Sequence, residues 1–213
     1  MSRLAPKPHH SMPPSSGVAT DLWPNPAVNQ TRRFMPSTWR TSARRAGYLG
    51  RHMNIPTHIA PFWKSFVQVQ AEDPTPRFFE AFHFDDNEPS ANELAQLVLA
   101  GTKRATAGLV WSFEAASVPL PKAGDLSVVT NWAKSPLCVI ETQRVDVVAF
   151  DQVSAEFAAT EGEGDGSLQY WQDAHWAYFG RECQRIGRFR DPKMPVVCER
   201  FEVIFQGQGE RAV

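Results

Sequence analysis

Hydrophobic side chains at helical spacing predict three helices in this chain. The first covers residues 61–70, where Phe and Trp recur on one face and a proline occupies the first turn. The second covers residues 90–100, which begin with a Ser-x-x-Glu capping box and end just before a glycine. The third covers residues 167–186, where large apolar side chains repeat with the period of a helix. Each helix therefore has an apolar face to bury against other elements.

Runs rich in Val, Ile and Phe, separated by Gly, Pro and Lys, predict a set of short β-strands. Residues 78–84 alternate as a half-buried strand does. Four further runs have a similar composition: residues 106–111, 125–132, 137–148 and 196–205. Too few helices connect these strands for a wholly parallel sheet. We therefore predict an α+β fold built on a small, mostly antiparallel β-barrel with helices packed around it.

The N-terminal quarter of the chain has a different composition. Residues 1–55 are rich in Pro, Ser and Arg and show no helical or strand periodicity, so we predict that they are disordered. This leader could instead be a targeting peptide or an RNA-binding tail, or translation could begin at Met53. The folded domain is expected at residues 56–208, followed by a tail at residues 209–213.

Charge is distributed unevenly along the chain. Residues 1–56 contain eight Arg or Lys and one acid, a net charge of +7, whereas the remaining 14 bases and 22 acids give -8. A body with this acidic excess cannot hold long nucleic acid by a general field, so any RNA contact must be local. No apolar run is long enough to span a bilayer, and no secretory signal pattern is present. We expect a cytoplasmic protein without a membrane partner.

One motif lies in the turn after the second predicted helix and has no evident packing purpose. It reads Gly-x-Lys-x-x-Thr and consists of Gly101, Lys103 and Thr106. Further segments of residues 61–205 flank this motif in a fixed order. They are FWKSF, FFEAFHF, LPKAGDLSVVT, PLCVIET, FAATEGEGDGSLQYW and MPVVCERFEVIF. In this order and spacing the chain resembles the ASCH family, whose hallmark is Gly-x-Lys-x-x-Ser/Thr after the first core helix. The resemblance implies a fold like that of the PUA RNA-binding domain.

Lys103 and Thr106 are the first candidates for chemistry. A lysine at this position could act as a cation toward a carbonyl or phosphate oxygen, or lose its proton if partly desolvated. The alternative is a solvated lysine that favours the C-terminal end of a helix. The Thr106 hydroxyl could be a nucleophile or hold a water, but it needs a neighbouring base. Its alternative is a β-branched residue at the start of a strand.

The resemblance implies that a glutamate before the last helix partners the lysine and the threonine. Alignment by eye favours Glu163, with Glu161 as the alternative carboxylate two residues away. Both lie in an acidic loop laced with glycine, which lets backbone approach a ligand. A solvated turn that caps the next helix would explain the same loop, including Asp165 and Ser167. The loop lacks the spacing of an EF-hand, so we predict no metal site and no cofactor.

Further ligand contacts are expected around this motif. The basic cluster of Arg181, Arg185 and Arg188 lies on one helical face and could contact phosphate or RNA, although arginine near a helix end is favourable without a ligand. Trp111 could stack a base, or it could belong to the core. His175 is interpreted as a packing or surface residue. The predicted ligand-binding residues are Gly101, Arg104, Trp111 and Asp165.

The resemblance implies a metal-independent hydrolase that acts on a modified pyrimidine nucleoside such as N4-acetylcytidine, with Lys103, Thr106 and Glu163 as catalytic residues. Two alternatives stay open: a ribonuclease on single-stranded RNA, and a non-catalytic RNA-binding module. The partner is accordingly a nucleoside or a short single-stranded RNA. The acidic body suits a small nucleoside better than a long polyanion. The sequence does not determine the oligomeric state.

Overall fold

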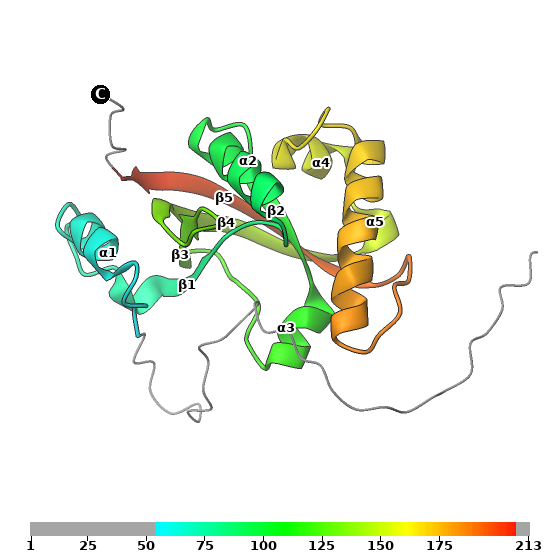
Figure 1. Cartoon of the computed structure of the whole chain (residues 1–213), viewed down its shortest axis with the longest axis horizontal. Helices are drawn as coiled ribbons and strands as arrows, with labels where there is room; N and C mark the ends of the chain where they lie inside the picture. Colours follow the sequence, from blue (N-terminus) through cyan, green and yellow to red (C-terminus); the bar gives the residue numbers. More distant parts are fainter. Residues whose placement is uncertain (1–53, 208–213) are drawn as a thin grey trace, which may run out of the picture. The chain divides into compact units, whose positions relative to one another are not determined.

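A computed structural model of the chain describes residues 54–207. Its centre is a five-stranded sheet with the strand order β1-β3-β4-β5-β2 (Figure 1). The first pair, β1 and β3, is parallel, and the other three pairs are antiparallel. In the order of the sheet, the strands are β1 (Phe78–Phe82), β3 (Leu126–Thr130), β4 (Pro136–Ala149), β5 (Pro195–Gln206) and β2 (Ala105–Leu109).

The sheet is not closed into a barrel, so that part of the prediction is wrong, whereas the mixed α+β fold is confirmed. The two edge strands, β1 and β2, do not pair with each other. The outer edge of β2 instead bonds to a helix end: the Arg104 N–H donates to the Thr160 carbonyl and the Ala107 N–H donates to the Glu161 carboxylate. A helix end therefore satisfies backbone groups that a further strand would pair in a barrel.

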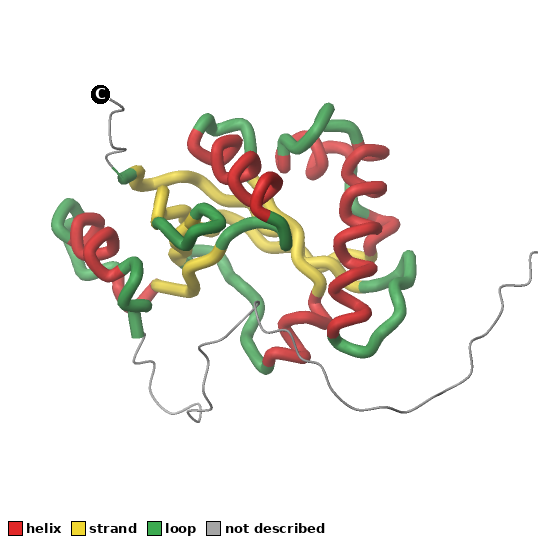
Figure 2. The backbone as a smooth tube through the Cα atoms, viewed as in Figure 1, coloured by secondary structure: helices red, strands yellow, loops and turns green. Residues whose placement is uncertain are grey.

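Helices surround the sheet (Figure 2). The three predicted helices are confirmed as α1, α2 and α5, and the shorter α3 and α4 were not predicted because seven residues show little periodicity. In chain order the helices are α1 (Ala60–Val67), the 3₁₀ turn Thr75–Arg77, α2 (Glu88–Leu99), α3 (Val110–Ala116), the 3₁₀ turn Phe150–Gln152, α4 (Ala155–Glu161) and α5 (Leu168–Arg185).

The helices pack on the sheet through separate apolar clusters. Neighbouring residues of β3 point to opposite faces, and Val128 packs with α1 whereas Val129 packs with α2. The helices α1 and α2 therefore cover opposite faces. The pair α4 and α5 packs on β2, β4 and β5 through a cluster that contains Trp171 and Phe179 (Figure 1). This packing brings the end of α4 and the middle of α5 beside the segment that enters β2.

Local signals explain where two helices begin. Asn87 rather than Ser90 caps α2, because its side chain accepts the Ser90 N–H at 3.0 Å. Ser167 caps α5 as predicted, accepting the Tyr170 N–H at 3.1 Å. Among the residues that the structure describes, no helix is both long and apolar enough to cross a membrane. The predictions for residues 1–53 of the leader and for the tail lie outside the described residues.

Candidate functional site

The amine of Lys103 is buried between two carboxylates. The chain turns at Gly101, whose φ of +74° is left-handed, and Lys103 follows with 1% of its surface exposed. Its Nζ donates to Glu161 Oε1 at 3.0 Å and to Glu163 Oε1 at 2.5 Å. The ring of Phe84 lies 5.1 Å from the same nitrogen. Lys103 is therefore not the solvated lysine of the alternative interpretation.

Hydrogen-bond donors and basic groups surround the carboxylate of Glu161. It ends α4, is 1% exposed, and bonds the Lys103 amine through Oε1. The same oxygen accepts the Ala107 N–H at 3.1 Å and lies 3.6 Å from Nε2 of His175. The other oxygen accepts the Trp171 Nε1–H at 2.5 Å. Since these donors occupy both oxygens, Glu161 has little capacity left for a ligand.

Glu163 is the more accessible carboxylate of the pair. It lies in the loop between α4 and α5, its side chain is 15% exposed, and its ion pair with Lys103, at 2.5 Å, is shorter than the one between Lys103 and Glu161. The loop folds tightly at Gly162, where φ is +68° and an added Cβ would lie 2.5 Å from the Thr102 carbonyl oxygen. A glycine is therefore required to bring Glu163 over the lysine.

Burial and charge act in opposite directions on these groups. Burial alone would lower the pKa of Lys103, but the charges of Glu161 and Glu163 outweigh it and the pKa is raised. Burial alone would raise the pKa of Glu161, yet Lys103 and His175 bring it down to about 2. At neutral pH the site therefore contains a firmly protonated amine beside a firmly ionised carboxylate.

His175 belongs to this centre, although the sequence interpretation treated it as a packing or surface residue. Its ring stacks on Trp171 with centroids 4.2 Å apart and planes 15° from parallel. Burial would lower the pKa of His175, but Glu161 and then Glu163 raise it overall. The two aromatic residues are four positions apart and share a face of α5. That spacing, next to an acidic loop, is the signal that could have identified them.

Thr106 lies apart from the Lys103 centre. Its neighbours Ala105 and Ala107 pack against the cluster of α4 and α5, so strand alternation turns Thr106 to the opposite face of the sheet. There it is paired across the strands with Glu199 of β5. Within residues 54–207 no hydrogen bond joins its hydroxyl to Lys103, Glu161 or Glu163. The structure thus brings two of the three predicted catalytic residues together and places the third elsewhere.

Glu199 forms a second carboxylate centre, which the sequence analysis missed. One of its oxygens accepts the Thr142 hydroxyl at 2.5 Å. Burial, with smaller contributions from the negative charges of Glu80 and Asp125, raises the pKa of Glu199 to about 7. Its segment reads as an ordinary alternating strand, so nothing in the local sequence distinguishes this carboxylate.

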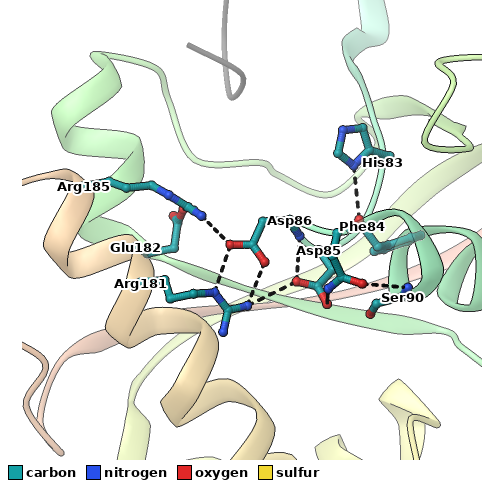
Figure 3. A network of polar contacts seen from close by, with 9 residues as sticks. His83, Phe84, Asp85, Asp86, Ser90, Arg181, Glu182 and Arg185 are labelled. Carbon is teal, nitrogen blue, oxygen red and sulfur yellow. Dashed lines mark hydrogen bonds and ion pairs between the residues drawn. The ribbon is translucent and has the colours of Figure 1, made fainter. Parts of the chain in front are cut away.

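Two of the predicted RNA-contacting arginines bind the loop between β1 and α2 (Figure 3). Arg181 donates through Nε and Nη2 to both carboxylate oxygens of Asp86, at 2.9 and 2.8 Å. Arg185 donates to Asp86 and, at 2.8 Å, to Glu182. Hydrogen bonds from Arg181, together with those from Arg185, hold the pKa of Asp86 well below its usual range despite partial burial. These two positive charges are therefore largely compensated.

The third arginine of the cluster is placed against α3. Arg188 lies over the ring of Trp111, 4.7 Å from its centroid, and pairs with Glu114 at 3.3 Å. Trp111 also packs against the cluster of α4 and α5. Its ring is only partly buried, so it contributes to that cluster and keeps an accessible surface.

The remaining predicted ligand contacts lie around the turn and the acidic loop. Gly101, Lys103 and Arg104 line a cavity of about 280 Å³ between the end of α2 and β5. Asp165 is exposed and accepts the Ser167 N–H at 2.8 Å, which agrees with its interpretation as part of a helix cap. Among the residues that the structure describes, no group of three or more His, Cys, Asp or Glu is arranged to hold a metal ion.

Comparisons with known proteins identify the family. A search against protein families matches the ASCH domain over residues 80–205. The chain is similar to the crystal structure of an ASCH domain from Lactobacillus crispatus JV V101, with 35% identity, a TM-score of 0.67, and coverage of 73% of this chain and 99% of that chain. It is also similar to the crystal structure of a protein from Enterococcus faecalis V583, with 26% identity, a TM-score of 0.62, and coverage of 73% and 97%. No curated protein matches the sequence. The chain belongs to the ASCH domain family.

Proposed function

We propose that this protein is a metal-independent hydrolase that acts on a modified pyrimidine nucleoside such as N4-acetylcytidine. The supporting observation is the Lys103 amine, buried and paired with Glu161 and Glu163. Removing ions from water costs several kcal/mol each, so a fold gains little stability from such a cluster. Groups with perturbed pKa values that gather at one place are typical of functional sites. The family is generally linked to RNA binding or hydrolysis.

Glu163 is the proposed general base. It is partly exposed, whereas the donors around Glu161 occupy both of that carboxylate's oxygens. In the proposed reaction Glu163 takes a proton from a water, and the water oxygen attacks the carbonyl carbon of the acetyl group. The C–N bond to the pyrimidine then breaks, Glu163 returns the proton to the departing nitrogen, and the products are cytidine and acetate.

Lys103 is the proposed electrostatic stabiliser. Because its pKa is raised, it keeps its proton at neutral pH and does not act as a base. An ammonium at this position donates a hydrogen bond to the oxyanion that develops on the acetyl oxygen. The mechanism requires no step from Thr106, whose side chain lies on the opposite face of β2.

Hydrolysis of single-stranded RNA is the second candidate. One observation favours it: Phe189 is 93% exposed and stands between Arg188 and Arg190. An exposed aromatic ring beside arginines is the type of surface on which an unpaired base stacks. The ion pairs of Arg181 and Arg185 with Asp86 weigh against it, because those arginines would have to exchange a carboxylate for a phosphate.

Incubation of the purified protein with N4-acetylcytidine and with a short single-stranded RNA, each with and without EDTA, tests the proposal. We expect release of cytidine and acetate that EDTA does not reduce. Glu163→Gln should lower turnover roughly 100-fold, the usual scale for a lost acid-base group. Glu93→Gln, a change at an exposed glutamate of α2, is the matched control and should have no effect. Cleavage of the RNA alone would select the second candidate, and a folded, fully active Glu163→Gln variant would remove the mechanism.

A further inference from the structure

Both ring nitrogens of His175 face hydrogen-bond acceptors. Nδ1 lies 3.0 Å from the backbone carbonyl oxygen of Trp171, which can only accept. Nε2 lies 3.6 Å from Oε1 of Glu161, whose carboxylate is also an acceptor. A neutral imidazole carries one N–H, so it would turn a lone pair toward one of these oxygens. The imidazolium, by contrast, presents a hydrogen toward both oxygens.

The position of the His175 ring affects how strongly the Lys103 amine interacts with each of the two glutamates. Glu161 has two basic neighbours, His175 and Lys103, whereas Glu163 is paired with Lys103. The Lys103 amine is closer to Glu163, at 2.5 Å, than to Glu161, at 3.0 Å. With an imidazolium against Glu161, that carboxylate attracts the Lys103 ammonium less strongly.

We propose that His175 is a positioning residue that acts as an imidazolium: it compensates Glu161, and the Lys103 ammonium is thereby directed at Glu163, where the reaction takes place. The effect of His175 on catalysis rests on the proposed function. The charge of His175 is a property of the folded protein and does not depend on that function. The charged groups that face His175 are Glu161 from α4, Glu163 from the following loop and Lys103 before β2.

The consequence is an alkaline limit to activity. The pKa of His175 is raised by Glu161 and Glu163 despite burial, so the imidazolium persists to a higher pH than that of an exposed histidine. The stabilisation that it provides is complete below the ordinary histidine pKa of about 6.5 and is lost as the pH rises through the folded-state pKa. Once His175 is neutral, Lys103 is the remaining cation for both carboxylates and is drawn toward Glu161. Turnover then falls with substrate affinity little changed.

Nitrogen NMR of the histidine-labelled protein tests the electrostatic part without any assay. The His175 signals are identified by their loss in His175→Gln, and His58→Gln, at an exposed histidine, is the control. We expect both His175 nitrogens to carry hydrogen at pH 7 in the unaltered protein, and the pKa to fall below the ordinary value in Glu161→Gln. A neutral His175 at pH 7 in the unaltered protein would overturn the inference, even if Glu161→Gln failed to fold.

Kinetics on N4-acetylcytidine test the positioning role. We expect His175→Gln to lower kcat about 10-fold to 100-fold, the scale of a misplaced catalytic group, with KM within about twofold. The alkaline fall of kcat that we expect for the unaltered protein should disappear in this variant. Unchanged kcat with the alkaline fall retained would overturn the positioning role. If the unaltered protein hydrolyses no acetylcytidine, the proposed function fails, and the NMR signal of the Lys103 ammonium then tests the inference. We expect this signal to shift in His175→Gln. An unshifted signal would contradict the inference.

Discussion

Glu161 and Glu199 are two largely buried carboxylates with opposite titration behaviour. Burial raises the pKa of both. Around Glu161 the cations Lys103 and His175 outweigh burial, and the pKa falls to about 2. Around Glu199, among residues 54–207, the Thr142 hydroxyl alone opposes burial, and the negative charges of Glu80 and Asp125 reinforce it, so the pKa rises to about 7. The comparison teaches that neighbouring charges, rather than depth in the protein, decide whether a carboxylate here is ionised.

The largest expected effect follows from removing the cation of the first centre. Lys103→Met leaves Glu161 buried without its main counter-ion, so the free energy of unfolding should fall by about 3–5 kcal/mol. Urea denaturation followed by circular dichroism measures this loss. Lys64→Met, at an exposed lysine of α1, is the control and should change stability by less than about 0.5 kcal/mol. Equal stability of the two variants would show that Glu161 is not held by charge.

The second centre should respond to substitution in the opposite sense. Below pH 4.5 Glu199 is protonated in both the folded and unfolded chains, whereas at higher pH the folded state resists ionisation until about pH 7. Stability is therefore lost as the pH rises, and Glu199→Gln avoids this loss while keeping an acceptor for Thr142. At pH 8.5 the variant should be more stable by about 3 kcal/mol, and at pH 4 nearly unchanged. Urea denaturation at both values checks the difference, and a variant that is less stable at pH 8.5 would refute the assignment.

A smaller effect is expected for the ion pairs near the surface. Asp86→Asn removes the carboxylate that binds Arg181 and Arg185, whose side chains are more than 40% exposed. Solvent screens such pairs, so the free energy of unfolding should fall by about 1 kcal/mol. The difference from the unaltered protein should shrink in 1 M salt. A salt-independent loss of several kcal/mol would place these pairs in the same class as the Lys103 centre.

The sequence predicted the elements with strong periodicity better than the contacts between them. Helices α1, α2 and α5 were predicted because their apolar faces recur over two or more turns. The open sheet was not predicted, because the backbone N–H groups at the outer edge of β2 are hydrogen-bonded by Thr160 and Glu161, more than 50 residues away in the chain. Such a contact depends on packing and leaves no local pattern.

The candidate site shows the same limit. The glycine-laced loop and the turn motif pointed to Lys103, Glu161 and Glu163, and the structure brings these three together. His175 was interpreted as a packing or surface residue, because its spacing of four from Trp171 next to the acidic loop was not taken as a sign of charge. The separation of Thr106 from the lysine could not be read from the motif, since the alternation of β2 begins only after Lys103.

The difference between Glu161 and Glu163 tests the central claim most directly, since the account makes the first an anchor and the second the base. The measurement is turnover of N4-acetylcytidine together with urea denaturation for Glu161→Gln and Glu163→Gln. We predict that Glu163→Gln keeps its stability within about 1 kcal/mol and loses roughly 100-fold in turnover, while Glu161→Gln loses about 3 kcal/mol of stability. A Glu163→Gln variant that loses stability and keeps its turnover would contradict the account.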